Sequence, residues 1–201
     1  IIRWVHHATL LLNGRNRSET EAFYRALSRQ AAYLARRWRS AAEGLPRFEA
    51  LTGLVYAGIS LIGMEGLVAP ATTALAAACL ADIDAEGGIP TRNPEELLEV
   101  LTLLTWSASA MSEANRQVPP ALASAITRIA PALRALRHAD GELARYHGGG
   151  KGAEGRLDQA LASATVRAGA TPAIAMGFAR LYGGRTSVIV DASPPPGGRA
   201  E

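Results

Sequence analysis

The sequence predicts a mainly α-helical protein whose last third turns to β-structure. In the first two thirds of the chain, apolar residues recur every three to four positions, which is the period of one helix face. Helix-starting motifs and short connections separate these stretches. Near residue 140 the period changes, and a Gly-Gly pair then separates two apolar runs. Helix pairs with short connections fit a solenoid or a toroid, although no repeat of fixed length is visible.

The first helices follow from their stripes and caps. Residues 1–7 resemble the middle of a helix. The next helix is expected to open with a capping box from Ser18 to Glu21 and to end in the basic run 36–39, where arginines suit the negative end of the helix dipole. One apolar stripe links the two ends, formed by Phe23, Leu27, Ala31, Leu34 and Trp38.

Four further helices are expected. One begins at Pro46 and another, rich in alanine, covers about 65–84 with Pro70 at its opening. A third opens at Asn93, with Glu96 completing its capping box, and the fourth has its stripe over 122–136 with a kink at Pro131. The helix from Pro46 has an apolar stripe of Phe48, Leu51, Val55, Ile59 and Ile62, and its other face carries Glu49, Gly53, Tyr56 and Ser60.

The end of the chain predicts a β-hairpin. Residues 174–182 and 185–190 form its strands, with Gly183 and Gly184 as a two-residue loop. An isolated hairpin is marginally stable in water, so we expect a larger sheet, most of it beyond Glu201. This divides the chain into a helical domain, residues 1–139, and the start of a β domain, residues 140–201.

Composition excludes several classes of protein. With 48% hydrophobic and 19% charged residues in 201, the chain is typical of a folded globular protein. A net charge of +3 does not indicate nucleic acid as a partner. The single cysteine, Cys79, permits no internal disulfide and is expected as a small buried hydrophobe. The longest uncharged stretches are too short to span a membrane. The character of both ends suggests an internal fragment of a longer protein, so the compartment stays open.

Few residues stand out as carriers of chemistry. The four histidines lack the spacing of a metal site, so none is expected. Arg92 and Asn93 lie at a helix N-terminus, where a carboxylate would be favoured, although Asn93 then also serves simply as a cap. Arg47 and Glu49 occupy a helix's first turn, where they form either a solvated pair or a site in which Arg47 neutralises a substrate carboxylate.

Taken together, several segments resemble the bacterial heparinase II/III family. They are residues 45–58, 84–98 and 136–150 and the hairpin that ends at Asp191. The resemblance implies an incomplete α/α toroid followed by the first strands of an antiparallel β-sandwich, with an acidic polysaccharide bound between them. It also implies a periplasmic or envelope location, with the cytoplasm left open. No cofactor is implied in this fragment, and a structural zinc would have its ligands downstream.

The resemblance further implies a carbon–oxygen lyase that cleaves a uronate-containing glycan by β-elimination. Such chemistry needs a group that neutralises the C5 carboxylate, a base for the C5 proton and an acid for the leaving oxygen. The family's lyases commonly have Asn-His where this chain has Pro46-Arg47, and a tyrosine where it has Glu96. The resemblance therefore assigns the carboxylate to Arg47 and proton transfer to Glu96 or Tyr56. Residues expected to bind substrate are Glu49, Arg92, Asn93, His138 and Tyr146.

Two alternatives stay open. One is a protein that kept the scaffold and binds an acidic glycan, or assists envelope assembly, without cleaving anything. The other is a helical scaffold for protein partners, which an exposed apolar patch in place of a polar cleft would favour. The sequence does not determine an oligomeric state.

Overall fold

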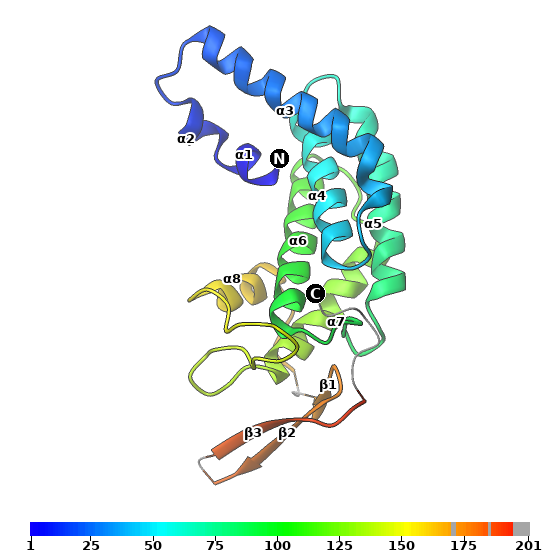
Figure 1. Ribbon diagram of the computed structural model, residues 1–201, viewed down its shortest axis with the longest axis vertical. Helices are drawn as coiled ribbons and strands as arrows, with labels where there is room; N and C mark the ends of the chain where they lie inside the picture. The colour runs from blue at the N-terminus through cyan, green and yellow to red at the C-terminus, as the bar shows by residue number, and fades with distance from the viewer. Residues whose placement is uncertain (170–171, 185, 195–201) are drawn as a thin grey trace.

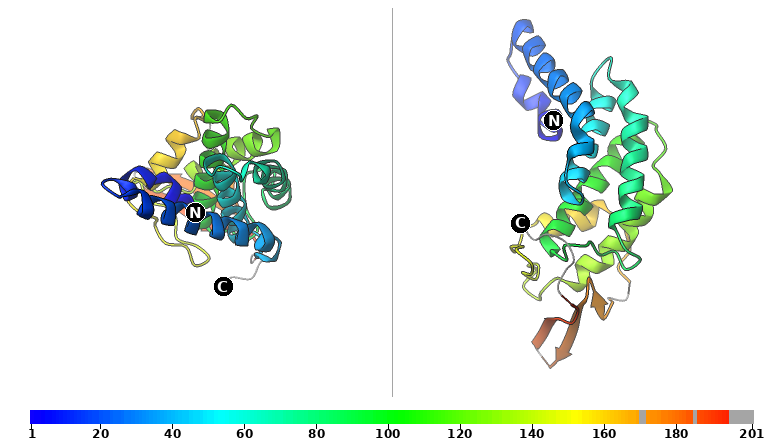
Figure 2. Two further views of the ribbon diagram at one scale, coloured as in Figure 1. Left: turned by 90° about the horizontal axis from the view of Figure 1, so that it is seen from above. Right: turned by 45° about the vertical axis from the view of Figure 1, so that its right-hand side comes forward.

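The computed structural model describes residues 1–169, 172–184 and 186–194. The protein is mostly helical, with a small three-stranded antiparallel sheet near its C-terminus. Four helices, α4 to α7, form the body; the arm made by α1, α2 and the start of α3 lies at one end and the sheet at the other (Figures 1 and 2). The predicted order, helices first and strands last, is confirmed, but the strands begin at Ile174 and not near residue 140.

The elements in chain order are α1 (Ile2–His6), α2 (Ala8–Leu12), α3 (Arg17–Arg37), the 3₁₀ turn η1 (Trp38–Ser40), α4 (Leu45–Ser60), η2 (Glu65–Leu67), α5 (Val68–Asp82), α6 (Pro94–Glu113), α7 (Pro120–Ala135), α8 (Arg156–Ser163), β1 (Ile174–Ala175), β2 (Phe178–Gly183) and β3 (Thr186–Asp191). Helix α4 packs on α5 and α6, and α7 packs on the same two helices. The body is therefore two stacked helix pairs.

The start of α3 corrects the expected capping box. The Asn16 side chain accepts a hydrogen bond from the Glu19 amide at 3.0 Å, and the Glu19 carboxylate accepts one from the Asn16 amide at 3.0 Å. Asn16 has the extended backbone that an N-cap needs, whereas Ser18 already lies inside the helix. The box predicted for Ser18 and Glu21 is therefore wrong by two residues.

The start of α6 is closer to expectation. Asn93 Oδ1 accepts from the amides of Glu95 and Glu96 at 2.9 and 3.2 Å, so Asn93 is the predicted N-cap. The Glu96 side chain does not complete a box. It accepts instead from the Thr91 hydroxyl at 2.7 Å, which ties the loop before α6 to the helix's first turn.

Helix α4 is buried on more sides than its stripe predicted. Phe48, Leu51 and Val55 lie in the core as expected, but Gly53 and Tyr56, assigned to the outer face, are buried too. Leu34 of α3 lies against Gly53, whereas Tyr56 contacts His6 of α1 and the Trp106 carbonyl of α6. Ile62 is fully exposed because α4 ends at Ser60, two residues before it.

The sheet differs from the single predicted hairpin. Met176 and Gly177 both have positive φ, 51° and 78°, and form a two-residue turn that divides the expected strand 174–182 into β1 and β2. In the second hairpin Gly183 pairs with Thr186, so the loop is shifted by one residue from the predicted pair and includes residue 185, which lies outside the described residues. The sheet packs on the helices through Ala175, Met176, Phe178 and Ile189.

The segment after residue 140 contains a helix that was not predicted. Leu157 and Ala160 of α8 are buried in the same hydrophobic cluster as Leu133 of α7. The expected alternation over residues 143–147 yields only an isolated bridge between Arg137 and Leu143 within the described chain. The hydrophobic core thus continues across residue 140, and the division into two domains there stays a prediction.

Gly87 provides a test of how closely the α5–α6 loop packs on α7. Its φ is +82°, and a Cβ at this position would lie 2.2 Å from the Arg128 backbone oxygen. We expect Gly87→Ala to lower the free energy of unfolding by about 2–4 kcal/mol, because backbone strain and a clash with main-chain atoms add together. The midpoint of chemical denaturation measures this loss.

Gly14→Ala is the matched control. Gly14 also has positive φ, +71°, but no atom lies within 4 Å of the added Cβ. This variant should lose only about 1 kcal/mol, the cost of the left-handed backbone. Equal losses in the two variants would contradict the close packing of the loop.

Candidate functional site

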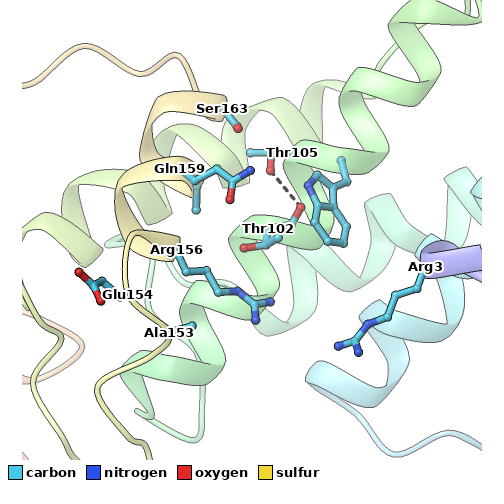
Figure 3. Close-up of a pocket in the computed structure, with 10 residues that line it drawn as sticks. Arg3, Thr102, Thr105, Ala153, Glu154, Arg156, Gln159 and Ser163 are labelled. Carbon is cyan, nitrogen blue, oxygen red and sulfur yellow. Dashed lines mark hydrogen bonds between the residues drawn. The ribbon is translucent and has the colours of Figure 1, made fainter. Parts of the chain in front are cut away.

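One candidate site is an open cavity of about 340 Å³ beside the middle of α6, which we call the α6 groove (Figure 3). Helix α6 forms one wall, α8 with the loop before it forms another, and Arg3 of α1 approaches from a third side. The lining residues are Arg3, Thr102, Thr105, Trp106, Ala153, Glu154, Arg156, Gln159, Ala160 and Ser163. Three helices that are distant in sequence therefore build it.

Helix α6 contributes Thr102 and Thr105 to the groove wall, where they are 7% and 6% exposed. The Thr102 hydroxyl donates to the Leu98 carbonyl at 2.8 Å, and the Thr105 hydroxyl donates to the Thr102 carbonyl at 2.9 Å. Because each hydroxyl proton is already used inside the helix, the free lone pairs of the threonine oxygens suit donors such as sugar hydroxyls. Trp106, half-buried, adds an aromatic surface beside them.

Two arginines supply the positive charge. Arg3 and Arg156 come from different helices and point toward one another across the groove (Figure 3). Arg156 forms an ion pair with Glu99 of α6, one turn before Thr102. Burial raises the pKa of Glu99 and exceeds the opposing effect of Arg156. The groove is therefore polar, with two cations and a carboxylate that ionises less readily than usual.

A second open pocket lies on the other side of Trp106, between α1, α4 and α6, and Tyr56 is part of its lining. The Tyr56 hydroxyl donates to the Trp106 carbonyl at 3.2 Å and lies 2.8 Å from His6 Nε2. Burial raises the pKa of Tyr56 to about 12 and lowers the pKa of His6. At neutral pH the phenol stays protonated, which suits a hydrogen-bond donor or an acid better than a base.

Arg92, assigned to substrate binding, lies in a third place and holds the sheet. It is only 9% exposed, and its guanidinium donates to the Met176 carbonyl at 2.7 Å, to the Pro194 carbonyl at 2.6 Å and to the Asp191 carboxylate. It also lies over the Phe178 ring, 4.7 Å from its centre. The hydrogen bond from Arg92 holds the pKa of Asp191 below its usual range.

Asn93 and Tyr146 lie in the same junction. The Asn93 amide donates to the His147 carbonyl at 3.3 Å. The Tyr146 hydroxyl donates to the Ile189 carbonyl at 2.6 Å, and its ring stacks on Phe178 at 4.3 Å between centres. The structure thus brings together three of the predicted substrate-binding residues, in contacts that join the sheet to α6.

The remaining predicted residues lie elsewhere. Arg47 donates to Glu43 at 3.2 Å and to the Ala41 carbonyl at 3.1 Å. Glu96 lies near the same end of α4, close to Gly44, and accepts from Thr91. Glu49 is exposed on α4, and His138 lies in the turn whose backbone bonds to Glu142. Within the described residues, the three predicted catalytic side chains therefore do not converge: Tyr56 is separate from Arg47 and Glu96.

Sequence reasoning missed the groove residues Arg3, Trp106, Arg156 and Gln159, and also Glu99, which pairs with Arg156 beside the groove. A signal for the wall of α6 was present, because polar or amphipathic residues interrupt this apolar helix every three to four positions at Thr102, Thr105, Trp106, Ser109 and Glu113. Arg3 and Arg156 carried no such signal, since only the packing of α1 and α8 brings them to α6.

Other chemistry finds little support in the described ranges. No three His, Cys, Asp or Glu side chains there are grouped to hold a metal ion, and no helix there is long and apolar enough to cross a membrane. Cys79 is fully buried, as predicted, and burial raises the pKa of its thiol to about 12. A zinc site downstream of Glu201 stays a prediction.

Arg92→Lys tests the role of the junction. A lysine cannot reach three acceptors in different directions or stack its charge on Phe178 in the same way. We expect a loss of about 2 kcal/mol in unfolding free energy and faster amide exchange in β1–β3, with α6 protected as before. Hydrogen exchange read by mass spectrometry measures both effects.

Arg145→Lys is the control for this change, because Arg145 forms only an exposed pair with Glu142. It should leave exchange in the sheet unchanged. If Arg92→Lys also left it unchanged, Arg92 would not be the group that holds the sheet.

Comparisons with known proteins give one informative similarity. No protein-family model matches the chain, and no solved structure matches it significantly. FtsZ-localized protein C of Caulobacter vibrioides (strain NA1000 / CB15N) is 34% identical to it over 203 residues, which cover 98% of this chain and 35% of that protein. The chain therefore spans about a third of the length of the curated relative it matches.

Proposed function

We propose that the α6 groove binds an acidic glycan, and that the chain is part of a heparinase II/III-like scaffold that holds this polymer without cleaving it. The observation that carries the proposal is the pair Arg3 and Arg156, which face each other beside a wall of threonines and an indole. A guanidinium binds a carboxylate through two parallel hydrogen bonds. The threonine oxygens accept from sugar hydroxyls, and the Trp106 indole packs on the apolar face of a sugar ring.

The positions of the predicted catalytic groups favour binding over cleavage. Elimination needs the neutralising group, the base and the acid around one sugar ring. Tyr56 lines a pocket that contains neither Arg47 nor Glu96, and its raised pKa keeps the phenol protonated at neutral pH. Lyase activity, with Arg47, Tyr56 and Glu96 as its catalytic groups, stays a prediction that the experiment below distinguishes.

The finer architecture belongs to the same proposal. The two stacked helix pairs, α4 with α5 and α6 with α7, support an incomplete α/α toroid. The β2–β3 hairpin leaves Leu181, Tyr182, Val188 and Val190 exposed, which supports its being the first part of a larger β-sandwich.

Binding to an oligogalacturonate, measured by calorimetry on the whole chain, tests the proposed function. Arg3→Gln and Arg156→Gln should each weaken binding about tenfold, because each removes a charge-assisted contact to a carboxylate. The wild-type chain should release no unsaturated uronate, which is detected by its ultraviolet absorbance. Release of that product would instead support the lyase.

Arg17→Gln is the matched control, because Arg17 is an exposed arginine of α3 outside the groove lining. It should bind like the wild type, and a neutral dextran should not bind at all. Failure of the wild type to bind any of a panel of uronic-acid polymers would contradict the proposal.

A second candidate function, a helical scaffold that works with FtsZ, is favoured by the relative at 34% identity. The name of that protein places it with FtsZ, and the alignment covers nearly all of this chain. This candidate replaces the envelope location implied by the family resemblance with a location at FtsZ. It leaves the groove available for an acidic ligand of another kind.

Fluorescence microscopy of the protein in its native cells tests the second candidate. A tagged copy at native expression should overlap with labelled FtsZ and should disperse when FtsZ is depleted. A signal in the periplasm, or one that FtsZ depletion leaves unmoved, would support the envelope location.

A further inference from the structure

Glu99 forms an ion pair with Arg156, one of the two arginines of the α6 groove. It lies on α6, one turn before Thr102, and its carboxylate pairs with the Arg156 guanidinium. The side chains of Glu99 and Arg156 are 29% and 34% exposed, respectively. The pair therefore lies at the edge of the groove, where water and a ligand have access to it.

The carboxylate of Glu99 is the same chemical group that an acidic glycan would present. Glu99 takes one nitrogen of the Arg156 guanidinium, Nη2, and compensates its positive charge. A ligand carboxylate therefore competes with Glu99 for the charge and the Nη2 donors of Arg156, whereas Arg3 is open to it. No comparable side chain pairs with Arg3 in the part of the chain that the structure describes.

The surroundings of Glu99 weaken its hold on Arg156 because they disfavour its ionised form. Glu95 on α6 and Glu49 on α4 oppose its negative charge, whereas Arg156 on α8 and Arg3 on α1 favour it. Burial is the largest effect and disfavours the ionised carboxylate. Loss of the ion pair through protonation therefore needs less acid than it would for a glutamate in water.

We propose that Glu99 is an internal competitor, which holds Arg156 in the empty groove and gives it up to an acidic ligand. The proposal rests on the proposed function of the groove and adds its regulation. A ligand with a single weakly held carboxylate does not displace Glu99. A polymer with carboxylates on neighbouring sugars does, because contact with Arg3 raises the local concentration of the next carboxylate at Arg156.

Lower pH should favour the ligand over Glu99 in the competition for Arg156. Between about pH 7.5 and about pH 5, a larger fraction of Glu99 is protonated than of a glutamate with an ordinary pKa of about 4.3. The sugar carboxylates, which are stronger acids, stay ionised in this range. The ion pair with Arg156 is therefore weakened as the pH falls, and the wild-type chain should bind oligogalacturonate more tightly at the lower pH.

Glu99→Gln tests the competitor with the whole chain and oligogalacturonate. The variant should bind about fivefold more tightly than the wild type at about pH 7.5, which corresponds to about 1 kcal/mol. Its affinity should change little down to about pH 5, whereas the wild-type affinity rises. A Glu99 that only supported α8 would give equal or weaker binding when replaced.

Glu154→Gln is the matched control, because Glu154 lines the same groove without pairing with Arg156. It removes the same charge and reports the general electrostatic effect, so its gain in affinity should be smaller than that of Glu99→Gln. Equal gains in the two variants would overturn the proposal.

A second measurement needs no substitution. Carboxyl carbon shifts from NMR of the wild-type chain follow the titration of Glu99 with and without ligand. Because bound ligand removes Arg156 from Glu99 and adds negative charge nearby, the Glu99 pKa should rise further on binding. An unmoved titration in a chain that binds ligand overturns the competitor and leaves the proposed function standing; no binding by wild type or Glu99→Gln at either pH overturns both.

Discussion

A buried guanidinium must find acceptors for its hydrogen bonds, and this requirement at Arg92 fixes how the sheet meets the helices. Arg92 comes directly before the N-cap of α6, and its backbone takes the left-handed conformation, φ 53°. Its side chain satisfies its donors with the Met176 carbonyl in the β1–β2 turn, with Asp191 at the end of β3 and with the Pro194 carbonyl just after it. Arg180 of β2 acts at the opposite helix, donating to the Ala135 carbonyl at the end of α7, where helical carbonyls lack internal partners. The start of α6 and the end of α7 together position the sheet.

Helix α6 therefore serves two surfaces at once. Its first turn anchors the sheet, and its middle forms a wall of the groove that also contacts α8 and Arg3. Trp106 lines both the α6 groove and the second pocket, which contains His6 and Tyr56, so the two cavities lie next to each other. The ion pair of Glu99 with Arg156 links α6 to α8 on this side. Stability and ligand chemistry thus depend on different turns of one helix.

Local patterns predicted most of the helices because burial of one face is visible in a single stretch of sequence. The stripe of α3 and the Asn93 cap of α6 are examples. Patterns failed where two local choices were equivalent: Asn16 and Ser18 both precede a glutamate by three residues, and only the path of the chain before α3 selects Asn16. The break at Met176 was invisible because methionine rarely adopts positive φ. The groove could not be predicted as a whole, since Arg3, Trp106 and Arg156 meet only through packing between distant helices.

The turn between β1 and β2 reverses the usual relation between a hairpin loop and the protein surface. Most such loops are exposed and accept insertions or sequence variation at little cost. Here Met176 is 6% exposed and its carbonyl accepts a hydrogen bond from Arg92, so this turn is the end of the sheet that is attached to the helices. The other end of the sheet, at Gly183 and Gly184, is exposed (Figure 1). Inserted segments, epitope tags and divergence between related chains should therefore be tolerated at the β2–β3 loop and selected against at Met176–Gly177.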